Sequence, residues 1–190
     1  MPLVLGTITH PRAIQALLVS LLDPRFEVRY RSGRALAHLM ALDPTLRVPP
    51  DAVYAAVQHE VATASGVWKG RTLLDTMDDD AWSPVMDELV RERAERSLEH
   101  VFTLLALTLP RKPVQVAFHG LCTDDLLLRG TALEYLESVL PPDVRKPLWP
   151  FLEPDRARRG PSRAPQEALT DLLNQNQSIA IKLEELRRKE

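Results

Sequence analysis

Proline is the residue that most constrains how this chain can fold. Sixteen prolines occur among the 190 residues, and they cluster instead of being spread evenly. Proline is tolerated in the first turn of a helix and in connections, but it breaks a helix interior. Long helices are therefore expected only in the proline-free windows, which are residues 12–23, 25–43, 51–83, 85–109, 114–140 and 166–190.

Apolar residues in the first two windows recur at helical spacing. One stripe comprises Ile14, Leu17, Leu18 and Leu21. The next stripe comprises Val28, Ser32, Ala35, Leu36, Leu39 and Met40. Spacings of three and four residues place each set on one face of a helix. Because the stripes are separated only by the tight acid-proline turn at residues 23–26, the sequence predicts an antiparallel helix pair over residues 11–41.

The same pattern returns 100 residues later. The matching positions of the two stripes are Val114, Ala117, Phe118 and Leu121, followed by Leu128, Ala132, Tyr135, Leu136, Val139 and Leu140. Any two amphipathic helices share a period, but here the turn length agrees as well, and Arg29 matches Arg129. We interpret this agreement as an internal repeat. A separation of 100 residues suits two to three units of about 40 to 47 residues, so further helices are expected between the two copies.

Two helices are expected in the middle of the chain. Residues 51–65 carry valines at four-residue spacing, and residues 83–109 begin with a serine cap followed by proline in the first helical position. Residues 65–82 lack a sustained apolar stripe and are predicted to form a long loop, with room for one short helix near residues 71–77. Residues 154–165 are a linker by composition. Residues 166–190 are predicted to form a helix or a helix pair.

Two segments resemble HEAT repeats, a family of stacked helix pairs. They are residues 11–41, with a turn acid followed by Val-Arg and small and leucine residues, and residues 123–136, TDDLLLRGTALEYL. In that family the turn acid and the arginine bond between neighbouring units. The resemblance implies this role for Asp23, Arg29, Asp124 or Asp125, and Arg129. It is clear over the two helix pairs, and the middle and the tail are only compatible with it.

A second resemblance covers residues 95–110, ERSLEHVFTLLALTLP, and residues 121–153. These segments resemble HEAT-like segments attached to bacterial proteins of the ATP/ADP-translocase type. That resemblance implies a cytoplasmic regulatory or coupling module and not the transporter itself. Together with the repeat, it predicts an all-α fold, an α-solenoid of stacked antiparallel helix pairs over residues 1–153. The linker at 154–165 follows, and residues 166–190 are expected to close the stack.

Charge and cysteine content exclude few functions. Lysine and arginine number 24 against 26 aspartates and glutamates, a formal net charge of −2, so the chain as a whole has no strong attraction to nucleic acid or anionic lipid. The single cysteine, Cys122, cannot form an intramolecular disulfide, and no secretory leader is apparent. The longest apolar stretch, residues 101–110, is about half of the roughly 20 residues that a membrane helix needs. We therefore expect a soluble cytoplasmic protein without membrane insertion.

Two short motifs carry part of a metal-binding or catalytic pattern. His59-Glu60 begins like the zinc-protease motif HExxH, but Thr63 stands where the second histidine would be. His119 and Cys122 lie one helical turn apart, a spacing that suits two metal ligands or a nucleophile and its base. No second pair has matching spacing, and a lone cysteine in an apolar helix usually packs as a small hydrophobe. We therefore predict no metal site, no cofactor and no enzymatic activity.

Three further segments could bind a ligand. Residues 65–72, SGVWKGRT, nearly match the phosphate-binding motif GxxxxGK[ST], but serine replaces the first glycine, arginine replaces the lysine, and no strand precedes them. The acids at 78–80 suit helix capping and solvation better than a cation. A basic run lacks the interleaved aromatic residues of a nucleic-acid site; its members are Arg156, Arg158, Arg159 and Arg163.

The three tryptophans suit either of two roles. Trp68, Trp82 and Trp149 could be anchors for a binding partner, because tryptophan is favoured in binding hot spots. They could equally seal the end of a helical core. The second interpretation is the favoured one.

The sequence thus predicts a non-catalytic scaffold that binds another protein or an adjoining domain of a larger assembly. In a helical-pair solenoid, the second helix of each pair normally lines the concave face. In the first pair that helix carries Arg31, Arg34 and His38 off its apolar stripe, so these are the predicted partner-binding residues. The alternative is a nucleic-acid-binding HEAT-like protein, which would need a basic groove that the near-neutral composition does not favour.

Overall fold

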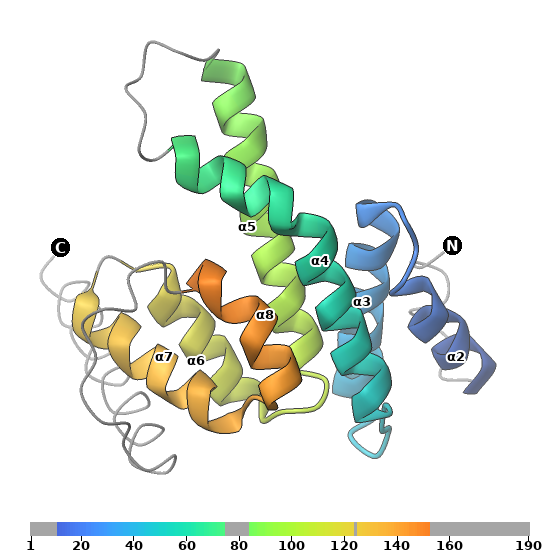
Figure 1. The fold of residues 1–190 in the computed structure, drawn as a ribbon. Coiled ribbons are helices and arrows are strands. Elements are labelled where there is room, and N and C mark those ends of the chain that lie inside the picture. The colour runs from blue at the N-terminus through green and yellow to red at the C-terminus, as the bar shows by residue number, and fades with distance from the viewer. Residues whose placement is uncertain (1–10, 75–83, 124, 153–190) are drawn as a thin grey trace, which may run out of the picture. The chain divides into compact units, whose positions relative to one another are not determined.

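The computed structural model describes residues 11–74, 84–123 and 125–152, and in this part of the chain it is all-helical (Figure 1). The elements are α2 (Pro11–Ser20), α3 (Phe26–Leu42), α4 (Pro50–Leu74), α5 (Pro84–Leu105), α6 (Arg111–Leu121), α7 (Leu126–Val139) and α8 (Pro142–Leu152). The predicted all-α class is confirmed for the described residues.

The chain divides into two compact units, residues 1–109 and residues 110–190. Helices α2 to α5 belong to the first unit and α6 to α8 to the second. The single repeat domain over residues 1–153 stays a prediction. The linker at 154–165 and the closing helix at 166–190 lie outside the described residues.

The first predicted helix pair is α2 and α3, which pack against each other within the first unit. On the predicted stripes, Leu17, Leu21, Leu36 and Leu39 are at most 1% exposed, and so belong to the core. Full burial of a leucine stabilises the fold by roughly 1.5–3 kcal/mol. The pairing therefore follows from the apolar spacing read in the sequence.

The turn between α2 and α3 is closed by local polar contacts. The Asp23 carboxylate accepts hydrogen bonds from the backbone N–H of Arg25 at 2.8 Å and from its guanidinium at 3.0 Å. These bonds lower the pKa of Asp23 to about 2. The carboxylate of Asp23 thus stabilises its own turn by binding Arg25, whereas the HEAT resemblance implied a bond between neighbouring units.

The matching segment in the second unit also forms a helix pair, α6 and α7. Asp125 caps α7, because its carboxylate accepts from the backbone N–H groups of Leu127 at 2.9 Å and Leu128 at 3.1 Å. Such a cap stabilises a helix by about 1 kcal/mol. Asp124, the other candidate for the turn acid, lies outside the described residues.

The two matched arginines make corresponding contacts in their own units. Arg29 donates from Nη1 to the carbonyls of Asp23 at 2.8 Å and Pro24 at 3.0 Å, at the end of the preceding turn. Arg129 donates from Nη1 to the carbonyl of Leu121, at the end of α6, at 2.6 Å. Arg29 therefore ties α3 to the turn that precedes it, and Arg129 ties α7 to the end of α6.

Each arginine also reaches the helix that follows. Nε of Arg29 contacts the carboxylate of Glu60 in α4, and Nη2 of Arg129 contacts the carbonyl of Leu152 at the end of α8, at 2.8 Å. Arg29 and Arg129 therefore play the same role, which is to connect their helix to the next one. The acceptor is a carboxylate in the first unit and a backbone carbonyl in the second.

Helix α4 extends well beyond the helix predicted at residues 51–65. The expected loop at 65–82 is wrong for residues 65–74, which continue α4. Of the short helix expected near residues 71–77, residues 71–74 belong to α4, and the remainder of both segments lies outside the described residues. Tertiary packing outweighs the weak helix propensity of Ser65 and Gly66, because Trp68 is only 6% exposed and donates from Nε1 to the Ala94 carbonyl of α5 at 3.2 Å.

Helix α8 was not predicted, because residues 142–152 contain three prolines and lie outside the proline-free windows. Pro142 occupies the first turn, where its missing N–H costs nothing. Pro147 and Pro150 lie inside the helix and on its exposed side. The other side is buried and drives the helix to form; its members are Val144, Leu148, Trp149 and Leu152.

Candidate functional site

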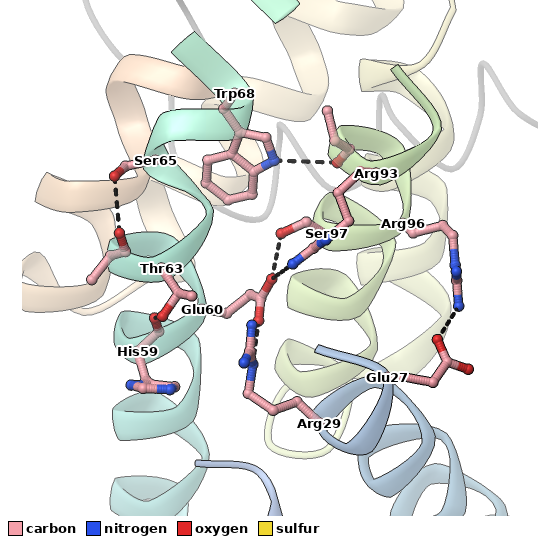
Figure 2. A network of polar contacts seen from close by, with 12 residues as sticks. Glu27, Arg29, His59, Glu60, Thr63, Ser65, Trp68, Arg93, Arg96 and Ser97 are labelled. Atoms are coloured by element: carbon pink, nitrogen blue, oxygen red, sulfur yellow. Dashed lines mark hydrogen bonds and ion pairs between the residues drawn. The ribbon is translucent and has the colours of Figure 1, made fainter. Parts of the chain in front are cut away.

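A buried ion pair lies at the centre of the first unit. Nε of Arg29 in α3 and Oε2 of Glu60 in α4 are 2.7 Å apart, and the two side chains are 1% and 0% exposed (Figure 2). A charge this deeply buried requires a partner of opposite sign, because its desolvation costs several kcal/mol. The pair therefore fixes α3 and α4 against each other.

Helix α5 joins the same carboxylate. Ser97 donates from Oγ to Oε1 of Glu60 at 2.5 Å, and Nη2 of Arg93 lies 3.8 Å from that oxygen. Figure 2 shows the three side chains converging on Glu60 from α3 and α5. We call Arg29, Glu60, Arg93 and Ser97 the buried charge cluster. It connects three helices that are distant in the sequence through one side chain.

His100 lies beside this cluster and is fully buried. Neither of its ring nitrogens has a hydrogen-bond partner. Its ring packs edge-on against Phe26, with 6.1 Å between centroids, and against the backbone of Gly33. The pKa of His100 is lowered to about 4, chiefly by burial. The Glu60 carboxylate opposes this shift, and the Arg29 and Arg93 guanidiniums contribute to it. The imidazole is therefore neutral at pH 7.

Aromatic rings of α3 and guanidinium groups of α5 form a layer next to the cluster. The Cζ atom of Arg93 lies 3.4 Å from the centroid of the Phe26 ring, and that of Arg96 lies 4.8 Å from the centroid of Tyr30. The Tyr30 hydroxyl donates to Glu99 at 2.8 Å. Partial burial lowers the pKa of Arg93. Cation–π contacts of this kind contribute about 0.5–2 kcal/mol each and hold α5 on α3.

The three predicted partner-binding residues lie on the exposed side of α3. Arg31, Arg34 and His38 are all exposed, and their spacing of three and four residues aligns them along the helix. Arg31 pairs with Glu27 one turn earlier at 2.7 Å, and Arg96 of α5 reaches the same carboxylate at 2.8 Å. These two guanidiniums lower the pKa of Glu27. We call Arg31, Arg34 and His38 the α3 face.

The residues that resembled parts of catalytic, phosphate-binding or metal-binding motifs lie in separate places in the structure. Glu60 of the HExxH-like start belongs to the buried charge cluster. Residues 65–72, the near match to a phosphate-binding loop, are helical within α4. Cys122 is exposed, so its expected packing as a buried hydrophobe is wrong, because it ends α6 as the C-terminal cap. His119 is exposed one turn earlier.

Two of the three tryptophans lie in the part of the chain that the structure describes, and both are buried. Trp68 and Trp149 are 6% and 5% exposed, which places both in the core, as favoured in the sequence analysis. Trp82, the acids at 78–80 and the basic run at 156–163 lie outside the described residues. Among the side chains that the structure describes, no group of three or more histidines, cysteines or acids is arranged to hold a metal ion.

Sequence reasoning missed most of the buried charge cluster. Glu60 was considered only as part of a protease motif, and Ser97, Arg93 and His100 were not singled out. One signal was present: Glu60 stands between Val57, Val61 and Ala64 on the apolar stripe of α4. A carboxylate on such a stripe needs a buried cation, and an arginine on the neighbouring stripe could supply it.

No protein-family model matches this chain, and no similar curated protein or solved structure is found. The HEAT resemblance therefore stays a prediction from the residues. Of the helices that the structure describes, none combines the length and the apolar character that crossing a bilayer requires.

Proposed function

We propose that this protein is a non-catalytic HEAT-type scaffold that binds another protein, or an adjoining domain of a larger assembly, through the α3 face. The observation that carries the proposal is the contrast between the two sides of one helix. On one side, α3 is held by the Arg29–Glu60 ion pair and by apolar packing. On the other side, it presents Arg31, Arg34 and His38 to solvent.

A rigid helix is a favourable platform for recognition. Association costs free energy for every side chain and segment that must be ordered, and a surface that is already fixed loses less. Arginine is also among the residues enriched where binding energy concentrates. In the solenoid that the internal repeat predicts, such faces are presented by successive helix pairs. An exposed thiol at Cys122 favours a reducing compartment, so we place the scaffold in the cytoplasm.

Charge reversal of the α3 face tests the proposal. We replace Arg31, Arg34 and His38 together by glutamate and measure capture of proteins from the native cell, together with helical content and melting temperature. Capture of a specific partner is expected to be lost while the fold is retained, because all three side chains are exposed. The one surface ion pair that is removed, Arg31–Glu27, contributes only about 0.2–1 kcal/mol.

A matched control carries a similar charge change on the second unit. Arg111, Lys112 and Lys146 are exposed, and their replacement by glutamate should leave capture unchanged. If both triple variants weaken capture equally, bulk charge and not the α3 face is responsible. If the captured ligand is nucleic acid and its affinity falls steeply with salt, the alternative function holds and the scaffold proposal is wrong.

A further inference from the structure

The second half of α3 carries an exposed stripe of mixed chemistry. Arg34, His38 and Leu42 follow one another at four-residue spacing, and all three are exposed. Leu42 is 62% exposed at the C-terminal end of α3, while the apolar side of the same helix is packed. The stripe therefore offers a cation at one end and an apolar side chain at the other, two turns apart.

Arg34 is held in place by an aromatic ring. Its Cζ atom lies 5.7 Å from the centroid of the Tyr30 ring. That ring is itself fixed, because Tyr30 is only 8% exposed and its hydroxyl donates to Glu99 at 2.8 Å. Nη1 of Arg34 also donates to the Tyr30 hydroxyl at 3.5 Å, and the other guanidinium N–H groups stay available to a planar anion such as a carboxylate.

Arg31, which lies one turn before the stripe, is already paired with an acid of α3. Arg31 donates to Glu27 at 2.7 Å, and Glu27 also accepts from Arg96. No carboxylate pairs with Arg34 among the residues that the structure describes. The positive charge of Arg34 is therefore available to an incoming acid, while that of Arg31 is shared with α3 itself.

The opposite end of the stripe disfavours acids. Asp43 follows Leu42 directly, and its carboxylate accepts from the backbone N–H of Thr45 at 2.9 Å. The carbonyl groups at the C-terminal end of α3 add partial negative charge at the same place. An acid near Leu42 would be repelled by both. These charges favour a carboxylate at Arg34 and an apolar group at Leu42.

We propose that the α3 stripe binds an acidic amphipathic helix of a partner protein, with a carboxylate on Arg34 and an apolar side chain on Leu42. The inference rests on the proposed scaffold function and specifies the partner's chemistry. Charge complementarity orients the partner helix along α3, and the apolar contact at Leu42 supplies the area that a surface ion pair alone does not.

A designed peptide is the probe. It is a cross-linked, fluorescently labelled helix of about 15 residues, the length at which isolated helices become marginal without a cross-link. It carries two glutamates one turn apart and a leucine two turns beyond the first. Two matched peptides differ only in having glutamine for both glutamates or alanine for the leucine. Binding to the full chain is followed by fluorescence anisotropy at two salt concentrations.

The glutamate peptide should bind about fivefold more tightly than the glutamine peptide at low salt, the upper range for one exposed ion pair. The alanine peptide should bind about tenfold more weakly, which corresponds to the loss of most of a leucine contact. Arg34→Gln should remove the preference for glutamate, and Leu42→Ala should remove the preference for leucine. Arg34→Glu should bind a lysine version of the peptide better than the glutamate version.

Equal affinity for the glutamate and glutamine peptides would overturn the inference. So would a peptide of residues 166–190 that binds more tightly than the designed helix in an Arg34-dependent way, because the occupant would then be this chain's own segment. If the α3 triple variant loses native capture but the chain binds the glutamate and glutamine peptides equally, the acidic partner is overturned and the scaffold function is not. Retention of native capture in that variant overturns the proposed function.

Discussion

Replacing Glu60 by glutamine should destabilise the first unit strongly, although the change in shape is small. The Glu60 carboxylate accepts from Arg29 at 2.7 Å and from Ser97 at 2.5 Å, and it is fully buried. Glutamine keeps an acceptor for Ser97 but leaves the Arg29 guanidinium buried without an anion. Breaking a buried pair by removing one partner typically costs about 3–5 kcal/mol.

The lower end of that range is expected here. Nη1 of Arg29 keeps its two bonds to the turn carbonyls of Asp23 and Pro24, so its burial is partly compensated after Glu60→Gln. We therefore expect a loss of about 3 kcal/mol in the free energy of unfolding. The double variant Arg29→Met, Glu60→Leu removes both charges. It should lower the free energy of unfolding less than either single change, because no unpaired charge then remains buried.

Urea denaturation measures the loss, and amide hydrogen exchange locates it. Exchange should accelerate in α3 and α4, while α6 and α7 of the second unit keep their protection. The surface pair supplies the control. Arg31→Gln breaks the bond between Arg31 and Glu27, two side chains that are both about half exposed, and should lower the free energy of unfolding by less than about 1 kcal/mol. A Glu60→Gln loss no larger than that of Arg31→Gln would refute the reasoning, as would a double variant that is less stable than both single ones.

Two further predictions concern the contact between His100 and α3. The pKa of His100 is lowered to about 4 in the folded chain, and the unfolded side chain titrates near 6.5. The unfolded state therefore binds more protons between these values, and stability should fall by about 3 kcal/mol as the pH drops from 6.5 to 4. His100→Leu should flatten this part of the stability–pH curve measured by urea denaturation. A Cβ at Gly33 would lie 2.8 Å from Cε1 of His100, so Gly33→Ala should lower stability by about 1–3 kcal/mol. Gly66→Ala, which meets nothing within 4 Å in α4, should raise it by about 0.5–1 kcal/mol, and equal thermal shifts in the two variants would contradict this account.

Local apolar spacing was enough to predict the helix pairs. Leu17, Leu36 and Leu136, each chosen from a stripe, are fully buried, and the matched arginines make corresponding contacts. These features depend on residues close together in the sequence, where helical periodicity is informative. The arrangement of several such pairs into a solenoid depends on contacts that no local pattern specifies, and it stays a prediction.

The remaining features depend on partners that are distant in the sequence. Glu60 is 31 residues from Arg29 and 37 from Ser97, so nothing local indicated their contact. The extension of α4 was missed for the same reason, because Trp68 lies 26 residues before Ala94, the α5 residue whose carbonyl it contacts. For the α3 face, exposure of Arg31, Arg34 and His38 agrees with the positions predicted off the stripe, while their role in binding stays a prediction.

The two matched arginines should differ in how freely evolution can alter their surroundings. Arg29 depends on the side chain of Glu60, so a substitution at either position removes the contact, and viable descendants must change both together. Arg129 donates to the carbonyls of Leu121 and Leu152, which every amino acid supplies. Drift at those acceptor positions cannot abolish the bonds. A saturation mutagenesis library should therefore show paired constraint at 29 and 60 but constraint on the arginine alone at 129.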